Sequence, residues 1–189
     1  MARPRSEDKR NAILDAAAEV VAKLGIGAPT AKIAKDAGVA EGTLFTYFSS
    51  KDELLNQLYL TLKADLSDAM TAGYPSDKSL IERCRHVWNC YVGWGSTHPL
   101  KHKAMTQLGV SERVTEKSKK IGAEAFEEIN QMMRELLAGG ALKDQPPAFA
   151  AAILSAMAGT TMDFIAREPG RAKQYTKAGF EAFWKAVTK

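Results

Sequence analysis

The sequence predicts an all-α protein of about nine helices. Apolar residues recur every three or four positions along most of the chain, and no segment shows the sustained apolar–polar alternation of a half-buried strand. The 189 residues are 46% hydrophobic and 25% charged, which is ordinary globular composition and argues against a disordered chain. A chain of this length buries enough surface to fold without disulfides or metals.

Residues that start and stop helices predict the boundaries. The first apolar stripe consists of Ile13, Leu14, Ala17, Val20, Val21 and Leu24. We expect Ser6 to cap this helix and Gly25 to end it in a left-handed conformation. Eight further helices are expected at about 30–37, 41–47, 51–72, 77–96, 99–108, 111–138, 146–166 and 171–187. Ser49 or Ser50 is expected to cap the helix at 51–72, and Ser111 the helix at 111–138.

The segment at 30–48, TAKIAKDAGVAEGTLFTYF, predicts two short helices joined by a tight turn. Gly38 supplies the positive φ that such a turn needs. Ile33 and Ala34 on the first helix, with Leu44 and Phe48 around the second, are expected to face a common core. This is helix-turn-helix geometry, in which the second helix enters the DNA major groove by its N-terminal end.

The residues left outside on the second helix are unusual for a solvated face, since they include a glycine, two threonines, a phenylalanine and a tyrosine. Hydroxyl groups bind phosphates and bases, and an exposed phenyl ring can contact a thymine methyl. A plain helical hairpin remains the alternative. We expect DNA contacts from Thr30, Lys32, Glu41, Gly42, Thr43, Phe45, Thr46, Tyr47 and Lys51.

At these positions the chain resembles the TetR family of transcriptional regulators. The resemblance rests on the following motifs: Ile13-Leu14-Asp15-Ala16-Ala17, Gly25, Thr30, Ile33-Ala34, Ala37-Gly38-Val39, Gly42-Thr43-Leu44-Phe45, Tyr47-Phe48 and Lys51-Asp52-Glu53-Leu54. It implies a homodimeric, all-helical, ligand-responsive repressor that binds a palindromic operator. The chain departs from the family at Ala40, where a serine is common, and therefore lacks one helix cap and one possible phosphate contact.

We accordingly expect a three-helix DNA-binding domain at 1–51 and a helical effector-binding and dimerisation domain at 52–189. Net charge permits this assignment without proving it, because 26 basic against 22 acidic residues gives +4 for the whole chain. Residues 1–51 hold eight basic and six acidic side chains, so affinity must rest on placement. Arg3 and Arg5 are candidates for minor-groove contacts, with a merely soluble terminus as the alternative.

The larger domain is rich in aromatic and methionine residues, which suit an apolar or aromatic effector as well as plain core packing. The expected effector site comprises Trp88, Tyr91, Met105, Phe126, Asn130, Met133, Met157 and Thr161. Small and aromatic residues on the last two helices predict a four-helix dimer interface. Its expected members are Ala151, Ser155, Ala158, Gly159, Met162, Thr176, Gly179 and Phe183.

Other classes of function find little support in the sequence. No catalytic residues, cofactor or metal are expected, since His98 and His102 stand four apart without further ligands. Cys84 and Cys90 are expected to be reduced, no signal peptide or membrane span is expected, and the cytoplasm is the expected location. Two alternatives stay open: a non-specific or architectural DNA-binding protein without an inducer, and a helical enzyme acting on small molecules.

Overall fold

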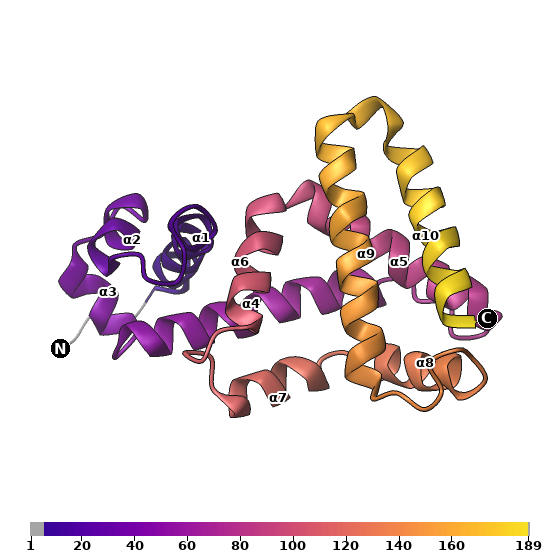
Figure 1. Cartoon of the computed structure of the whole chain (residues 1–189). Coiled ribbons are helices and arrows are strands. Elements are labelled where there is room, and N and C mark those ends of the chain that lie inside the picture. Colours follow the sequence, from indigo (N-terminus) through magenta and orange to yellow (C-terminus); the bar gives the residue numbers. More distant parts are fainter. Residues whose placement is uncertain (1–5, 189) are drawn as a thin grey trace. The chain divides into compact units, whose positions relative to one another are not determined.

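The computed structural model describes residues 6–188, and helices without strands make up the regular structure of that range (Figure 1). This confirms the all-α prediction. The ten α-helices are α1 (Glu7–Leu24), α2 (Thr30–Asp36), α3 (Glu41–Tyr47), α4 (Lys51–Thr71), α5 (Leu80–Thr97), α6 (Pro99–Gly109), α7 (Glu116–Glu124), α8 (Glu127–Ala138), α9 (Pro147–Arg167) and α10 (Ala172–Thr188). A short 3-10 turn, η1 (Pro169–Arg171), leads into α10.

Contacts divide the chain into two compact units. The head unit extends to Asp65 and takes in His98–Ala125, and the body unit contains Leu66–Thr97 together with Phe126 and the residues after it. Helix α4 therefore contributes residues to both units. The predicted boundary at residue 51 separates a DNA-binding domain from an effector-binding domain. The compact units do not test that functional boundary, so it stays a prediction.

In the head unit, α1 packs against α2 and α6, and α2 packs against α3. Ile13 and Ala17 of α1 are fully buried, because the predicted stripe faces this core. Leu24 was expected in the same stripe, but it is 59% exposed, since the helix ends there at Gly25. Gly25 ends the helix with a positive φ of 82°, but its ψ of 175° lies outside the left-handed helical region, so the predicted left-handed cap is only partly confirmed. Ser6 occupies the N-cap position, but its side chain accepts no capping hydrogen bond, so that part of the prediction is wrong.

The start of α4 follows the predicted serine cap. The Ser50 hydroxyl accepts a hydrogen bond from the Glu53 amide at 3.0 Å, and the Glu53 carboxylate accepts one from the Ser49 amide at 2.6 Å. These bonds satisfy amides that have no partner inside the helix.

The single helix expected at 111–138 is instead two, α7 and α8, broken at Ala125 and Phe126. The expected cap at Ser111 is also wrong, because Thr115 caps α7 by accepting a hydrogen bond from the Ser118 amide at 3.2 Å. The break separates a helix of the head unit from a helix of the body unit. The apolar period continues across it, so periodicity alone could not locate it.

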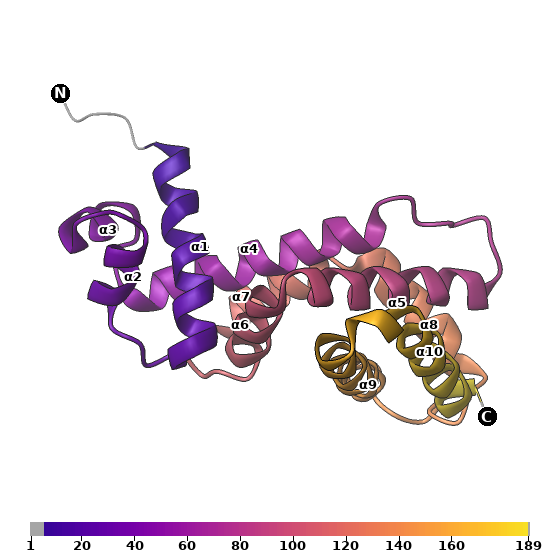
Figure 2. The same cartoon turned by 90° about the horizontal axis from the view of Figure 1, so that it is seen from above.

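The body unit consists mainly of α5, α8, α9 and α10, with α5 contacting the other three. Figures 1 and 2 show α9 and α10 as an antiparallel pair. Trp88 lies at the centre, fully buried, with its ring stacked 5.7 Å from that of Phe183. A Cβ at Gly179 would lie 2.7 Å from Trp88, so only glycine allows α10 this close to α5.

Helix α9 is more apolar than expected. Its 18-residue window has a mean hydropathy of 1.5, and 33% of that window is buried within the chain. By length and composition it could cross a membrane, contrary to the expectation that no stretch would be apolar enough. Its packing against α5, α8 and α10 is that of a helix in a globular unit.

Candidate nucleic-acid interface

The turn between α2 and α3 is fixed by its backbone. Gly38 has φ of +69°, and its amide donates to the Lys35 carbonyl at 3.1 Å, while the Val39 amide donates to the Ala34 carbonyl at 3.0 Å. These two bonds form the Schellman arrangement that ends a helix at a left-handed glycine. The predicted role of Gly38 is confirmed.

Buried residues hold α3 on the head unit. Ile33 and Leu44 are fully buried, and Ala34 and Phe48 are 1% exposed. Leu44 lies within α3 and Phe48 follows its last residue, and both side chains are buried in the head unit. The opposite side of α3 is thereby directed outward.

The outward face holds the residues predicted to contact DNA. Glu41, Gly42 and Thr46 are exposed, Thr43 and Tyr47 are half-buried, and the Phe45 side chain is 42% exposed. A Cβ at Gly42 would meet no atom within 4 Å, and Gly42 does not have a positive φ. The fold therefore does not require glycine at this position, whereas close approach of a phosphate would.

Two hydroxyl groups near α3 have partners inside the chain. The Thr30 hydroxyl donates to the Glu41 carboxylate at 2.6 Å, which ties the start of α2 to the start of α3. The Thr46 hydroxyl donates to the Thr43 carbonyl at 2.6 Å. In this conformation both hydroxyls meet an external group as acceptors, so they suit N–H donors on base edges better than phosphates.

The Tyr47 hydroxyl differs from them, because it accepts a hydrogen bond from the Ser6 amide at 3.1 Å. Its own proton is not used by that bond and is available to donate. A donor held beside the outward face of α3 suits a phosphate oxygen.

The predicted cations are partly engaged within the chain. Lys32 pairs with Asp36 on α2, with Nζ–O distances of 2.5 and 2.6 Å. Lys51 donates to the Ala28 carbonyl at 2.7 Å. Burial lowers the pKa of Lys51, and the positive charge of Arg113 lowers that pKa further. An anion beside Lys51 would counter both effects.

Two further arginines lie beside these elements. Arg10 of α1 lies over the Phe48 ring at 5.7 Å and donates to Gln57 at 3.1 Å. Arg113, from the loop before α7, pairs with Asp52 at 2.7 Å. Sequence reasoning did not select either one. The position of Arg10 on the first predicted helix could have indicated a role near the DNA-binding helices. Arg113 is 61 residues from Asp52 in the sequence, and only the tertiary fold brings the two side chains together. Arg3 and Arg5 lie outside the described residues.

The eight residues predicted to bind the effector do not line the pocket found in the body unit. Met105 belongs to the head unit and the other seven to the body unit. Trp88, Tyr91, Met105, Phe126, Met133 and Thr161 are buried, while Asn130 and Met157 are half-buried. That pocket lies between α5 and α10 and is lined by other residues. The effector site therefore stays a prediction.

The predicted dimer residues separate by burial. Ala151 and Ser155 are exposed, and Gly159, Thr176 and Gly179 are half-buried. Ala158 and Phe183 are completely buried within the chain and Met162 nearly so, which leaves them little or no surface for a partner. The exposed small residues on α9 stay candidates for an interface.

Comparison with known proteins agrees with this geometry. Residues 13–58 match the family described as bacterial regulatory proteins, tetR family. The uncharacterized HTH-type transcriptional regulator YhgD of Bacillus subtilis (strain 168) is 26% identical over 129 residues. That match covers 68% of this chain but only 62% of the length of YhgD.

Solved structures share the whole fold. A TetR family transcription regulator of Shewanella sp. PV-4 is 28% identical, with a TM-score of 0.83 over 98% of this chain and 100% of the other. The regulator FadR of Bacillus subtilis, solved in complex with stearoyl-CoA, is 16% identical, with a TM-score of 0.68 over 94% and 99% of the two chains. Residues 13–58 therefore match the N-terminal domain of the bacterial regulatory proteins of the tetR family, and the described chain shares the fold of a solved TetR family transcription regulator.

Proposed function

We propose that this protein is a repressor that binds a palindromic operator as a homodimer and is released by a small molecule. The observation that carries the proposal is the outward face of α3, where Phe45 is 42% exposed and Gly42 stands in open space on a helix fixed by Leu44 and Phe48. Such a face costs stability in water and serves a purpose in a major groove.

Six of the nine predicted DNA residues divide into base-reading and backbone-binding groups, and the other three make contacts within the chain. Phe45 supplies an apolar contact for a thymine methyl, and Thr43 and Thr46 reach base edges from the same face. Tyr47 and Lys51 supply donors for phosphates, as does the backbone at Gly42. Thr30 and Glu41 tie the starts of α2 and α3 together through their hydrogen bond, and Lys32 pairs with Asp36 on the surface of α2.

The proposed homodimer uses the exposed apolar face of α9. Only 33% of its apolar window is buried inside the chain, and the exposed residues Ala151 and Ser155 are small enough for a second helix to approach closely. In a twofold-symmetric helix-turn-helix dimer, the two recognition helices bind successive major grooves about 34–36 Å apart. Substituting Ser155→Arg should dissociate the dimer in sedimentation experiments. The matched change Ala141→Arg, in the exposed loop before α9, should not.

Effector control is proposed to use the aromatic and methionine side chains of the body. Support comes from FadR of Bacillus subtilis, which shares the fold and was solved with stearoyl-CoA. Helix α4 contributes residues to both units, so a shift at its base can reach the DNA-binding helices. By linkage, operator DNA must weaken effector binding by the factor with which the effector weakens DNA binding. Such a protein acts in the bacterial cytoplasm, where the DNA lies.

Selection of bound sequences from a random duplex pool tests the DNA-binding part directly. The proposal expects one palindrome with two half-sites about one helical turn apart. Equal affinity for all duplexes at fixed salt would instead support the non-specific DNA-binding protein. For the effector part, a compound that saturates the body without changing operator affinity contradicts release by that compound.

A further inference from the structure

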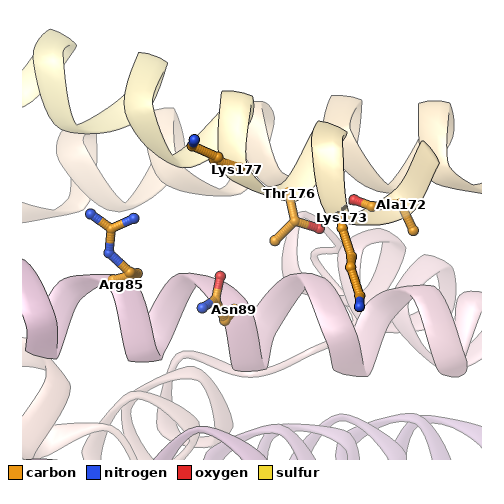
Figure 3. Close-up of a pocket in the computed structure, with 6 residues that line it drawn as sticks. All are labelled: Arg85, Asn89, Ala172, Lys173, Thr176 and Lys177. Atoms are coloured by element: carbon orange, nitrogen blue, oxygen red, sulfur yellow. Dashed lines mark hydrogen bonds between the residues drawn. The ribbon is translucent and has the colours of Figure 1, made fainter.

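A basic groove lies between α5 and α10 of the body unit. It has a volume of about 380 Å³ and is lined by Arg85 and Asn89 of α5 and by Ala172, Lys173, Thr176 and Lys177 of α10. Figure 3 shows Arg85 and Asn89 rising from α5 toward α10, and Lys173 reaching from α10 toward α5. Three of the six lining residues are cations and none is a carboxylate.

Buried contacts fix the two walls of this basic groove. The indole nitrogen of Trp88 donates to the Thr176 carbonyl at 2.9 Å, and Trp88 itself is fully buried. The glycine at 179 lets α10 lie directly against Trp88, as noted above. The spacing of the cations on α5 and α10 is therefore set by the core rather than by flexible loops.

The charges of the groove are largely uncompensated. Arg85 lies over the ring of the buried Phe180 at 4.4 Å, which holds its guanidinium by a cation–π contact and leaves the N–H edges to other partners. Neither Arg85 nor Lys173 forms an ion pair with any residue between 6 and 188. Lys177 reaches only Glu181, at 3.9 Å, in an exposed pair. Three cations around one space repel each other, and an anion bound there relieves that repulsion.

We propose that the basic groove binds a phosphate-bearing small molecule. A guanidinium binds phosphate oxygens in a bidentate manner, and the ammonium groups of Lys173 and Lys177 add point charges on the facing helix. The Asn89 amide supplies a neutral N–H donor from the wall shared with Arg85. A phosphate group carries about −1.5 to −2 charges at neutral pH, so it matches three cations better than a single carboxylate does. The volume is in the range of small-ligand pockets.

This inference goes beyond the proposed function. The effector predicted from the body core is apolar or aromatic, whereas the groove takes a multiply charged anion. Its test measures binding to the body directly and uses neither an operator nor an effector, so its failure would leave the repressor proposal intact.

Inorganic pyrophosphate is the probe, titrated calorimetrically into the full chain in metal-free buffer, with acetate at equal ionic strength as the reference anion. We expect pyrophosphate to bind and acetate not to bind. Lys173→Gln should weaken pyrophosphate binding about tenfold, the equivalent of about 1.4 kcal/mol. Lys173 is exposed, so this variant should fold normally, with an unchanged melting temperature. Arg85→Gln should weaken binding at least as much.

The matched control is Lys143→Gln, which removes the same charge from an exposed loop of the body unit and should leave pyrophosphate binding unchanged. Three results would overturn the proposal. The first is equal binding of pyrophosphate and acetate. The second is unchanged binding in Lys173→Gln and Arg85→Gln, or an equal loss in Lys143→Gln. The third is a groove that binds a random DNA duplex in a Lys173-dependent manner but does not bind pyrophosphate.

Discussion

The backbone amide of Ser6 donates a hydrogen bond to the phenolic oxygen of Tyr47, 3.1 Å away and 41 residues along the chain. This bond joins the first residue before α1 to the last residue of α3. The bond uses the Tyr47 oxygen as an acceptor, so the hydroxyl proton stays available to donate.

Tyr47→Phe should weaken DNA binding by about tenfold at fixed salt, the equivalent of about 1.4 kcal/mol, because one hydrogen bond to a charged phosphate is lost. The free energy of unfolding should fall by about 1 kcal/mol, since only the part-buried bond from the Ser6 amide is lost within the chain. Fluorescence anisotropy with a selected duplex measures the first effect and urea denaturation the second. Tyr175→Phe removes the same atom from the body unit and should leave DNA binding unchanged.

Gly42→Ala should separate stability from DNA binding. Alanine is favoured over glycine in a helix by up to about 1 kcal/mol, and a Cβ at this position meets no atom within 4 Å, so the free energy of unfolding should rise. DNA affinity should fall, because the methyl group would lie between the backbone and a phosphate. A stabilised variant with unchanged operator affinity would remove Gly42 from the interface.

At Gly179, replacement by alanine should lower the free energy of unfolding, whereas at Gly42 it should raise it. A Cβ there would lie 2.5 Å from the Thr161 hydroxyl and 2.7 Å from Trp88, both in the packed core. Gly179→Ala should therefore lower the free energy of unfolding by about 1–3 kcal/mol, as overpacked cores do. Gly93→Ala in α5, where nothing lies within 4 Å, is the control and should stabilise the protein. Equal effects of the two substitutions would contradict the packing described for α10.

The two free thiols should differ in reactivity. Burial raises the pKa of Cys84 to about 12, and its side chain is completely buried. Burial also raises the pKa of Cys90, which is half-buried. Only the thiolate reacts, and the raised pKa keeps Cys84 in the protonated form near neutral pH. Raising the pH from 7 to 9 should therefore accelerate the labelling of Cys90 by a disulfide reagent, while Cys84 reacts only after denaturation. Rapid labelling of Cys84 in the native protein would show that α5 opens.

Local signals predicted the DNA-binding region well. The Gly38 turn, the buried Leu44 and Phe48, the exposed Phe45 and the serine cap of α4 all depend on residues within a few positions of one another. Signals of this kind do not depend on the rest of the fold. The break at Ala125 and Phe126 was missed because it depends on which unit each half joins.

The sequence alone thus determined the helical class, the helix-turn-helix motif and the family, because helix periodicity, left-handed glycines and caps act over one or two turns. The tertiary structure decided which polar groups are engaged and which are available. It placed the Ser6 amide on Tyr47, Arg113 on Asp52, and Arg85 opposite Lys173 across the basic groove. These pairs join residues 41 to 88 positions apart, and only the packing of the buried helix faces sets their distances.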